Sequence, residues 1–355
     1  MAVNSGVSGT GSMGKNTKRF YVGLDIGGTK LMALVLDEKF NCLGRFRMKT
    51  RSKKAGEPLF ERVVECVSTA IKESGVDRAR LIGIGVGSPG PLDPATGVII
   101  DTPNIGWKNF PLGDKLAARF KTVVAVDNDV NLGTYGEYHF GAARGGRHVF
   151  GAFPGTGIGA GILIDGQLYH GASGAAGEIG HVIMDPAGPL CGCGNHGCLE
   201  SFAGRLPIAG QLAALVLRDQ ANSLAGDAGC DLREIRSSSI AEAIKDGDRL
   251  VEQVLRREAA RIGLAVANVV NVLSPDTVVL GGGLVEAMPK LFTEEVTRAI
   301  KKYALPFLAK FVKVAVTELG DDAVAMGAAQ LIAERVAARK KRTPRRREGA
   351  RARRT

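Results

Sequence analysis

The sequence predicts an α/β protein built from two related halves. Apolar runs with strand character alternate with amphipathic helical segments through the first 130 residues, which is typical of α/β folds. A shift of 128 positions aligns residues 23–37 with residues 151–165, so the second half opens with the pattern of the first. With 355 residues, the chain is long enough for two domains.

Each half begins with a predicted β-hairpin. In the first half, a tight glycine-rich turn joins the apolar strands FYVGLDIGG and KLMALVLDE, residues 20–28 and 30–38. The same strand–turn–strand pattern returns at residues 151–165. We therefore expect each half to direct one glycine turn toward a shared cleft. The equivalent positions are Gly23 and Gly151, Gly27 and Gly155, and Asp37 and Asp165.

The remaining elements follow from apolar spacing and from breaker residues. A helix is predicted between Pro58 and Gly75, because proline is tolerated in the first turn of a helix and glycine often ends one. After residue 200 the pattern is mainly helical. The other predicted elements are a strand at 80–93, a helix at 112–120, a strand at 121–129, a helix from about Asn131, a helical segment at 239–273, a strand at 274–283 and a last amphipathic helix at 321–338.

Composition restricts the class of protein. Hydrophobic residues make up 45% of the chain and charged residues 23%, as in ordinary globular proteins. No apolar run is long enough to cross a bilayer, and residues 1–18 form a Gly/Ser tail, expected to be flexible, without the apolar segment of a secretory signal. Six cysteines are too few for a disulfide scaffold, so a reducing cytoplasm is the expected setting.

The net charge of +11 resides almost entirely at the C-terminal end. From Arg335 onward there are eleven Lys and Arg residues and one acid, Glu348, which leaves the rest of the chain nearly neutral. Residues 339–355 lack apolar periodicity and are expected to be disordered. We favour a solvated basic tail with at most nonspecific binding of nucleic acid, and we expect no membrane partner.

The two glycine turns have the composition of phosphate-binding loops. DIGGTK (25–30) and PGTGIGAG (154–161) present successive backbone N–H groups with little Cβ obstruction, a backbone arrangement that binds anions. Asp25 would hold Mg²⁺ through water, and Lys30 would add positive charge. Neither turn fits the Walker or the dinucleotide-binding pattern, since each leads into a strand. The alternative is a hairpin that only turns the chain.

Polar side chains end the strand within VAVDNDVN, residues 124–131. Ligands of α/β proteins bind at the carboxyl ends of strands, and a carboxylate there can accept a proton from a hydroxyl group. Asp and Asn are also the residues that cap helices. We expect a cap or turn role for Asp127 and leave both roles open for Asp129, with Asn128 holding its neighbour. Asn104, in the loop DTPNIGW, offers an amide for a sugar hydroxyl.

Three cysteines and a histidine crowd into PLCGCGNHGCLE, residues 189–200. Such a soft ligand set suits tetrahedral Zn²⁺. The C-x-C spacing differs from the C-x-x-C of redox motifs, and a disulfide across one residue would be strained. Spacing leaves open whether His181 or His196 is the fourth ligand. The sulfur ligands would be Cys191, Cys193 and Cys198.

Glutamates flank this cysteine-rich element on both sides. Glu178 precedes His181 by three residues and shares its face if the turn is helical, and Glu200 follows Cys198 by two. A bound metal would hold the backbone beside both carboxylates, which could then bind hydroxyl groups. The alternative is that both are surface ion-pair residues, as is usual for glutamate.

Together these motifs resemble the ROK family of sugar kinases, and bacterial glucokinases in particular. DIGGTK, VDNDVN, GTGIGAG, GEIGH and CGCGNHGCLE occur in the family's order, and the likeness extends from about residue 20 to about residue 335. The resemblance implies an actin-like ATPase (ribonuclease H-like) fold, with two α/β domains and a cleft between them. It also implies transfer of the γ-phosphoryl group of ATP to the 6-hydroxyl of a hexose, glucose first, with Mg²⁺.

The resemblance assigns roles to individual residues, with Asp129 as the general base. The implied sugar contacts are Asn104, Asn128, Asp129, Glu178, His181 and Glu200. The implied ligands of a structural Zn²⁺ are His181, Cys191, Cys193 and Cys198. The implied ATP-binding residues are Asp25, Gly27, Gly28, Thr29, Lys30, Gly155, Thr156, Gly157, Gly281, Gly282 and Gly283.

The resemblance also implies domain limits and an oligomer. A smaller α/β domain would comprise residues 19–130 and 321–338, and a larger one with the zinc site residues 131–320. A homodimer or homotetramer is expected.

Kinases of N-acetylmannosamine, N-acetylglucosamine, mannose or fructose share these motifs. ROK repressors add a DNA-binding domain, which we do not expect because the first strand starts near residue 20. Residues Phe153 and Pro154 depart from the family pattern. Because proline has no backbone N–H group, Pro154 removes one donor from the second turn.

Overall fold

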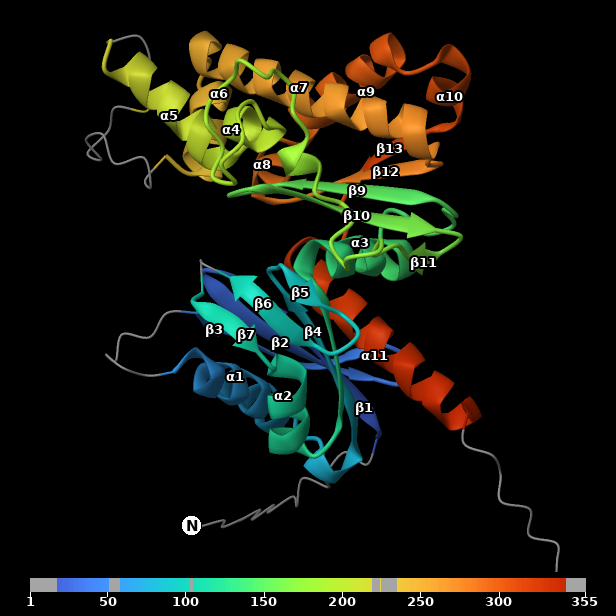
Figure 1. The fold of residues 1–355 in the computed structure, drawn as a ribbon. Helices are drawn as coiled ribbons and strands as arrows, with labels where there is room; N and C mark the ends of the chain where they lie inside the picture. The colour runs from blue at the N-terminus through green and yellow to red at the C-terminus, as the bar shows by residue number, and fades with distance from the viewer. Residues whose placement is uncertain (1–17, 51–57, 103–104, 219–223, 225–234, 343–355) are drawn as a thin grey trace, which may run out of the picture.

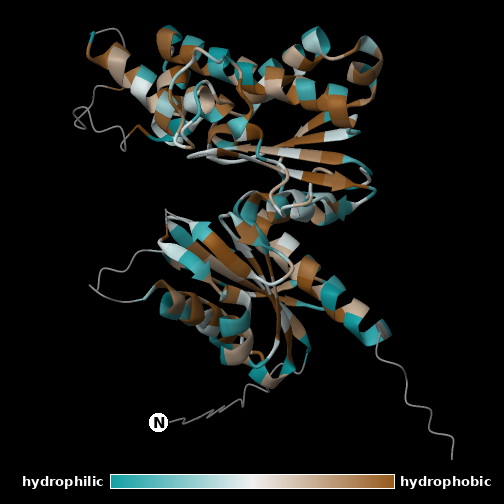
Figure 2. Cartoon of the chain, in the orientation of Figure 1, coloured by the Kyte–Doolittle hydropathy of each residue, from teal (hydrophilic) through white to brown (hydrophobic). Residues whose placement is uncertain are grey.

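The chain folds into two α/β lobes that lie one above the other (Figure 1). The computed structural model describes residues 18–50, 58–102, 105–218, 224 and 235–342. Each lobe is built on one five-stranded sheet. In both sheets the strands are predominantly hydrophobic, and helices pack against them (Figure 2).

The first sheet has the strand order β3-β2-β1-β4-β8. Strands β1 and β2 pair antiparallel from Phe20 with Asp37 to Ile26 with Leu31, which confirms the first predicted hairpin. Strands β4 and β8 extend the sheet in parallel. The strands are β1 (Phe20–Ile26), β2 (Lys30–Asp37), β3 (Cys42–Lys49), β4 (Leu81–Ser88) and β8 (Val123–Asn128).

The second sheet repeats this topology. Its order is β11-β10-β9-β12-β13, with an antiparallel β9–β10 hairpin and with β12 and β13 added in parallel. The strands are β9 (Val149–Pro154), β10 (Ile158–Ile164), β11 (Gln167–Leu168), β12 (Thr277–Leu280) and β13 (Lys313–Val316). The identical order and directions confirm the internal repeat predicted from the sequence.

Alternating side chains of the smaller lobe pack on two different layers. Leu31, Ala33 and Val35 of β2 face α1 (Leu59–Glu73) and α2 (Leu112–Phe120), whereas Met32 and Leu34 face α11 (Ala323–Arg342). This alternation is the two-residue period of a strand buried on both faces. The elements of this lobe are α1 (Leu59–Glu73), η1 (Arg78–Arg80), α2 (Leu112–Phe120) and the short antiparallel strands β5 (Leu92–Asp93), β6 (Val98–Thr102) and β7 (Trp107–Phe110).

In the larger lobe, one face of the sheet carries most of the helices and the other face packs on α3 (Figure 1). Among the helices described, none combines the length and the apolar character that crossing a membrane requires. The helices are α3 (Asp129–Phe140), η2 (Ile179–His181), α4 (Leu199–Ala203), α5 (Arg205–Val216), α6 (Ser237–Lys245), α7 (Arg249–Leu273), α8 (Gly283–Ala287), α9 (Pro289–Tyr303) and α10 (Pro306–Phe311).

Several predicted boundaries differ from the structure. The helical segment at 239–273 is two helices, because Gly247 adopts φ +93° and Asp248 caps α7 through the N–H groups of its first turn. The last helix, α11 (Ala323–Arg342), is preceded by η4 (Gly320–Asp322) and includes residues 339–342, which we had assigned to the basic tail. The rest of that tail and residues 1–17 lie outside the described residues.

Helices α3 and α11 lie against each other between the two sheets (Figure 1). A Cβ atom at Gly136 would collide with the Ala323 carbonyl, and one at Gly327 with the Leu132 carbonyl, so the two backbones are in contact. Helix α3 contacts both sheets. The predicted domain limit at residue 130 therefore falls inside a helix that belongs to the junction of the lobes.

Candidate functional site at the lobe junction

Two carboxylates occupy one row of the first sheet. The strand register pairs Asp25 with Gly87, and Gly87 with Asp127. Paired residues on neighbouring strands point to the same face, so both buried carboxylates face the layer of α3 and α11. A Cβ at Gly87 would lie 3.5 Å from the Cα of Asp129, which places the start of α3 above this row.

Asp129 is the first residue of α3 and is half-buried. Burial raises the pKa of Asp129 to about 6, together with the charge of Glu178 and against the hydrogen bond that Val130 N–H donates at 2.9 Å. Burial and the charge of Asp129 raise the pKa of Asp25 to about 7. The first strand and the start of α3 thus form one electrostatic site.

The residue that caps α3 is Asn128. Its Oδ1 accepts hydrogen bonds from the backbone N–H groups of Val130 at 2.9 Å and Asn131 at 3.1 Å. Asp127 instead lies within β8 and is buried. Of the two roles predicted for Asp127, the cap was wrong, because the helix begins at Asp129, two residues earlier than expected, and the cap moves to Asn128.

The first glycine turn, residues 27–29, is closed by Gly27 N–H donating to the Lys30 carbonyl at 2.9 Å. Thr50 holds it from behind, with its Oγ1 donating to the Gly27 carbonyl at 2.6 Å. Gly28 and Thr29 are exposed, and a Cβ at Gly28 would meet no atom within 4 Å. The turn therefore leaves open space over its backbone.

Lys30 takes part in a charge cluster that the sequence analysis missed. Its Nζ pairs with Asp321 of η4, which also accepts a hydrogen bond from Arg47 Nη1 at 3.0 Å. Lys30 and then Arg47 hold the pKa of Asp321 below its usual range. Burial, followed by the charge of Asp321, raises the pKa of Glu286 in α8. No local pattern predicts this cluster, because nearly the whole chain separates Lys30 from Asp321.

The second glycine turn is supported by the larger lobe. Gly155 N–H donates to the Gly157 carbonyl at 2.8 Å, and Arg205 N–H, at the start of α5, donates to the Gly155 carbonyl at 3.0 Å. Thr156 is exposed at its tip. This turn therefore resembles the first: its backbone is fixed from one side and open on the other.

The third glycine segment, residues 281–283, lies against the second turn. Gly281 N–H donates to the Ala152 carbonyl at 3.0 Å. Gly282 has φ +82°, and a Cβ there would lie 2.6 Å from the Pro154 carbonyl oxygen. A Cβ at Gly281 would lie 2.5 Å from the ring of Phe153. Phe153-Pro154 thus forms the surface on which this segment packs.

Glu200, in α4, contacts the second turn directly. Its Oε2 accepts a hydrogen bond from Ile158 N–H at 2.8 Å, and a Cβ at Gly157 would collide with the carboxylate. A Cβ at Gly180, beside His181, would lie 3.4 Å from the same oxygen. Glu200 is half-buried and makes no surface ion pair among the described residues. Glu200 therefore holds the second turn beside the segment of His181.

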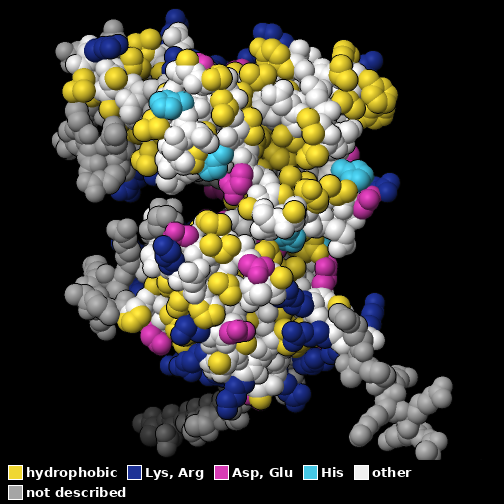
Figure 3. Space-filling view, viewed as in Figure 1, with side chains coloured by type: hydrophobic (Ala, Val, Ile, Leu, Met, Phe, Trp, Pro, Cys, Tyr) yellow, Lys and Arg dark blue, Asp and Glu magenta, His cyan; other side chains and the backbone are white. Residues whose placement is uncertain are grey.

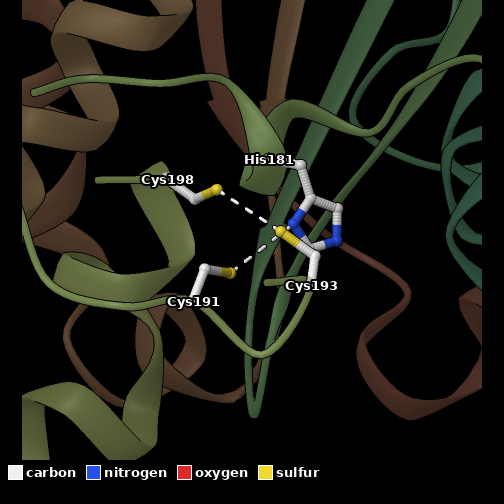
Figure 4. Close-up of side chains that lie close together, drawn as sticks. All are labelled: His181, Cys191, Cys193 and Cys198. Atoms are coloured by element: carbon white, nitrogen blue, oxygen red, sulfur yellow. Dashed lines mark hydrogen bonds between the residues drawn. The ribbon is translucent and has the colours of Figure 1, made fainter. Parts of the chain in front are cut away.

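The cysteine-rich element brings four potential metal ligands together (Figure 4). One ligand atom from each of His181, Cys191, Cys193 and Cys198 lies within 4.8 Å of the others. His196 lies apart, with its Nδ1 3.1 Å from the Gly188 carbonyl oxygen. The structure thus selects His181 from the two histidines that spacing left open.

The four side chains fit a zinc ion. Cys191 Sγ lies 3.7 Å from His181 Nδ1, and Cys193 Sγ lies 3.6 Å from Cys198 Sγ. Tetrahedral Zn²⁺ sets ligand separations of about 3.8 Å between two sulfurs and about 3.5 Å between sulfur and nitrogen. Burial raises the pKa of the Cys198 thiol to about 12, and a bound metal would offset that cost by stabilising the thiolate.

The other nitrogen of His181 faces away from the sulfurs. His181 Nε2 lies 3.9 Å from Glu178 Oε2, since η2 places these residues on one face as the spacing predicted. Glu178 is exposed, and its charge acts on Asp129. The histidine ring therefore connects the cysteine cluster with the site of Asp129.

Side chains of both lobes border a notch in the surface between the lobes (Figure 3). Acidic side chains lie near it, whereas Lys and Arg side chains gather on the smaller lobe (Figure 3). Asn104, the remaining predicted sugar contact, lies outside the described residues.

The fold agrees with that of known proteins. The chain belongs to the ROK family, whose profile matches residues 21–335. It has the actin-like ATPase fold, with two α/β domains, that its structural relatives share.

Two glucokinases are among the similar proteins. The glucokinase of Halalkalibacterium halodurans is 33% identical over 316 residues, which cover 88% of this chain and 95% of that protein. The crystal structure of a ROK family glucokinase from Streptomyces griseus, in complex with glucose and AMPPNP, is 31% identical. It has a TM-score of 0.76 and covers 88% of this chain and 98% of the other.

The family also includes regulators. The xylose repressor of Caldicellulosiruptor bescii is 32% identical over 278 residues, which cover 78% of this chain and 68% of the repressor. Membership of the family therefore leaves both sugar kinases and transcriptional repressors as classes, and residues at the site must separate them.

Proposed function

We propose that the protein is an ATP-dependent kinase that phosphorylates the 6-hydroxyl of a hexose, with glucose as the first candidate. The observation that carries the proposal is Asp129, a half-buried carboxylate with a pKa of about 6 at the lobe junction. A carboxyl group with this pKa is mostly ionised at neutral pH and is a stronger base than an ordinary aspartate. The similarity to glucokinases supports glucose.

In the proposed reaction, Asp129 accepts the proton of the hexose 6-hydroxyl as that oxygen attacks the γ-phosphorus of ATP. The bond from the γ-phosphorus to the β,γ-bridging oxygen breaks, and ADP leaves. Because phosphoryl transfer depends mainly on positioning and charge, one base and well-placed donors are sufficient. The sugar would be bound by Asn104, Asn128, Glu178, His181 and Glu200.

The glycine turns would hold ATP. Exposed backbone at Gly28 and Thr29 and at Thr156 offers N–H groups to phosphate oxygens, and Gly281–Gly283 would lie on the adenosine side. When bound, Mg²⁺ would neutralise charge on the phosphates, and Asp25 would hold it through water. Lys30 would have to exchange part of its ion pair with Asp321 for a phosphate.

His181, Cys191, Cys193 and Cys198 would hold a structural Zn²⁺. The metal would fix the segments that carry Glu178 and Glu200, so its role is to order the sugar site rather than to take part in the reaction. Thiolate ligands persist in a reducing compartment, which supports a cytoplasmic location. We further propose a homodimer or homotetramer by analogy with the family.

The repressor alternative shares the fold but does not need a base at Asp129. Kinases of N-acetylmannosamine, N-acetylglucosamine, mannose or fructose remain alternative functions. The geometry of the loops decides which orientation of a single sugar hydroxyl the site accepts. Binding of DNA with loss of affinity on adding sugar, and without turnover, would favour the repressor.

The test is ADP release in a coupled assay with a panel of hexoses and N-acetylhexosamines. Glucose should give the highest kcat/KM. Asp129→Ala should lower kcat by at least about 10²-fold, while glucose binding remains measurable by calorimetry. Asp165→Ala, which removes an exposed carboxylate paired with Arg147, is the matched control and should leave kcat unchanged. The absence of turnover with every sugar would overturn the proposal.

A further inference from the structure

A hydrogen bond joins the two lobes at Asp127, two residues before Asp129 in the sequence. His170, which follows β11 in the larger lobe, places its Nε2 2.7 Å from Asp127 Oδ2 in β8 of the smaller lobe. The Asp127 side chain is 2% exposed and that of His170 is 30% exposed. The contact is therefore a shielded pair, in which a hydrogen bond is stronger than in water.

The other oxygen of Asp127 organises the turn that precedes the proposed base. Asp127 Oδ1 accepts hydrogen bonds from Asn128 N–H at 2.7 Å and from Asn131 Nδ2 at 3.1 Å. Asn128 in turn caps α3. These hydrogen bonds link Asp127, Asn128 and Asn131 to one another. Asp129 lies between them in the sequence.

The backbone of His170 leads through a short loop to the proposed sugar contacts. Its carbonyl accepts a hydrogen bond from Ala176 N–H at 3.1 Å, which closes the loop 170–176. Gly177 follows at φ +101°, with its carbonyl bonded to Ala160 N–H at 3.0 Å, and Glu178 comes next. The loop that starts at His170 therefore ends at the carboxylate whose charge acts on Asp129.

The Asp127 carboxylate favours the protonated form of His170. The hydrogen bond to the Asp127 carboxylate is the largest cause that raises the pKa of His170, and burial opposes it. A protonated imidazole compensates the buried carboxylate, whereas an apolar residue at position 170 would leave that carboxylate without its partner across the junction.

We propose that His170 is a positioning residue for phosphoryl transfer: it holds Asp127, and through Asp127 it fixes the turn that presents Asp129 to the sugar. The proposal rests on the proposed kinase function. Because the hydrogen-bonded loop 170–176 leads directly to Gly177 and Glu178, the same contact sets the position of the base relative to the sugar contacts of the larger lobe. A displacement of about 1 Å at a reacting group is enough to cost on the order of 100-fold in rate.

The first experiment compares His170→Leu with His170→Gln. Glutamine places an amide nitrogen near the position of Nε2 and retains the donor, whereas leucine removes it. His170→Leu should lower kcat at least tenfold, toward the order of 100-fold, with the KM for ATP changed less than about twofold. His170→Gln should recover most of the loss. His148→Leu is the control, since His148 is another half-buried histidine of this lobe and contacts Asp165.

The second experiment separates the contact from general destabilisation. Asp127→Asn combined with His170→Leu should lose no more rate than the worse single variant, because both act through one contact. Additive losses, or a wild-type kcat in His170→Leu, would overturn the proposal. Unfolding temperatures of all variants identify any that fail to fold. If His170→Leu is one of them, the kcat of His170→Gln is compared with that of the wild type instead.

A third measurement does not depend on turnover. The imidazole pKa of His170, followed by NMR, should fall in Asp127→Asn because the carboxylate no longer stabilises the charged ring. An unchanged pKa would show that the contact is absent and would overturn the proposal. If the wild-type protein phosphorylates no hexose while this pKa falls as expected, the proposed function fails and the contact stands.

Discussion

At Asp129, burial and a like charge act in the same direction on one carboxyl group. Burial and Glu178 raise its pKa to about 6, while the N–H group of Val130 restrains the shift. The charged form is needed for a base, so the group is active above this pKa and inactive below it. The environment therefore sets the range of pH in which proton transfer works.

We predict that kcat/KM for glucose falls tenfold per pH unit on the acidic side, with an apparent pKa near 6. Glu178→Gln should move this limb to lower pH, because it removes a like charge that raises the pKa of Asp129. The measurement is a pH–rate profile of both proteins. Asp165→Asn should leave the limb unchanged. A wild-type limb below pH 5 would contradict the assignment of the base.

At the scale of elements, the cysteine-rich loop, η2 and α4 form one unit around the proposed metal. Cys198 immediately precedes α4, which carries Glu200, and His181 ends η2, which begins after Glu178. A metal that holds both short elements would hold both glutamates, since helices of three to five residues have little stability of their own.

We predict that the protein binds about one Zn²⁺ per chain and that Cys198→Ser loses it. The affinity for hexose should then fall about tenfold or more, with a smaller change in kcat, because the sugar contacts lose their order. Metal analysis and glucose titration measure both effects. Cys66→Ser changes a buried cysteine outside the cluster and should retain the metal. Full hexose affinity in metal-free protein would contradict the structural role.

At the scale of the whole molecule, a single buried carboxylate joins two segments that connect the lobes. Glu137 of α3 is fully buried and accepts hydrogen bonds from Ala142 N–H at 2.8 Å, Glu318 N–H at 3.1 Å and Leu319 N–H at 2.8 Å. Glu318 and Leu319 follow β13 of the larger lobe and precede α11 on the smaller one. Glu137 thus holds α3 to the segment by which the chain returns to the first sheet.

Glu137→Ala should destabilise the protein by about 3–6 kcal/mol, because three backbone N–H groups lose the fully buried carboxylate that accepts from them. Glu137→Gln should cost less, since the amide oxygen still accepts. Urea unfolding measures both. Glu334→Gln alters a partly exposed carboxylate of α11 that accepts a hydrogen bond from Tyr135 of α3, and it should change stability by less than about 1 kcal/mol. Equal effects of all three variants would contradict this role for Glu137.

Some features could be predicted because their causes are local. The hairpins at residues 20–37 and 149–164 follow from strand patterning around glycine turns, and the three candidate sulfur ligands follow from the close spacing of the cysteines, whereas the choice of His181 over His196 required the structure. The cap of α3 could not be assigned, because Asp127, Asn128 and Asp129 all have capping side chains and only the packed helix selects one.

By itself, the sequence determined the class of fold, its internal repeat, the positions of the glycine turns and the cysteine cluster, since each depends on residues close together in the chain. Tertiary structure alone decided the contacts of Lys30 with Asp321, Asp127 with His170, and Glu137 with the segment before α11. The physical reason is that a charge or a hydrogen-bonding group is satisfied by whichever partner packing brings within about 3 Å, and spacing along the chain carries no record of that partner.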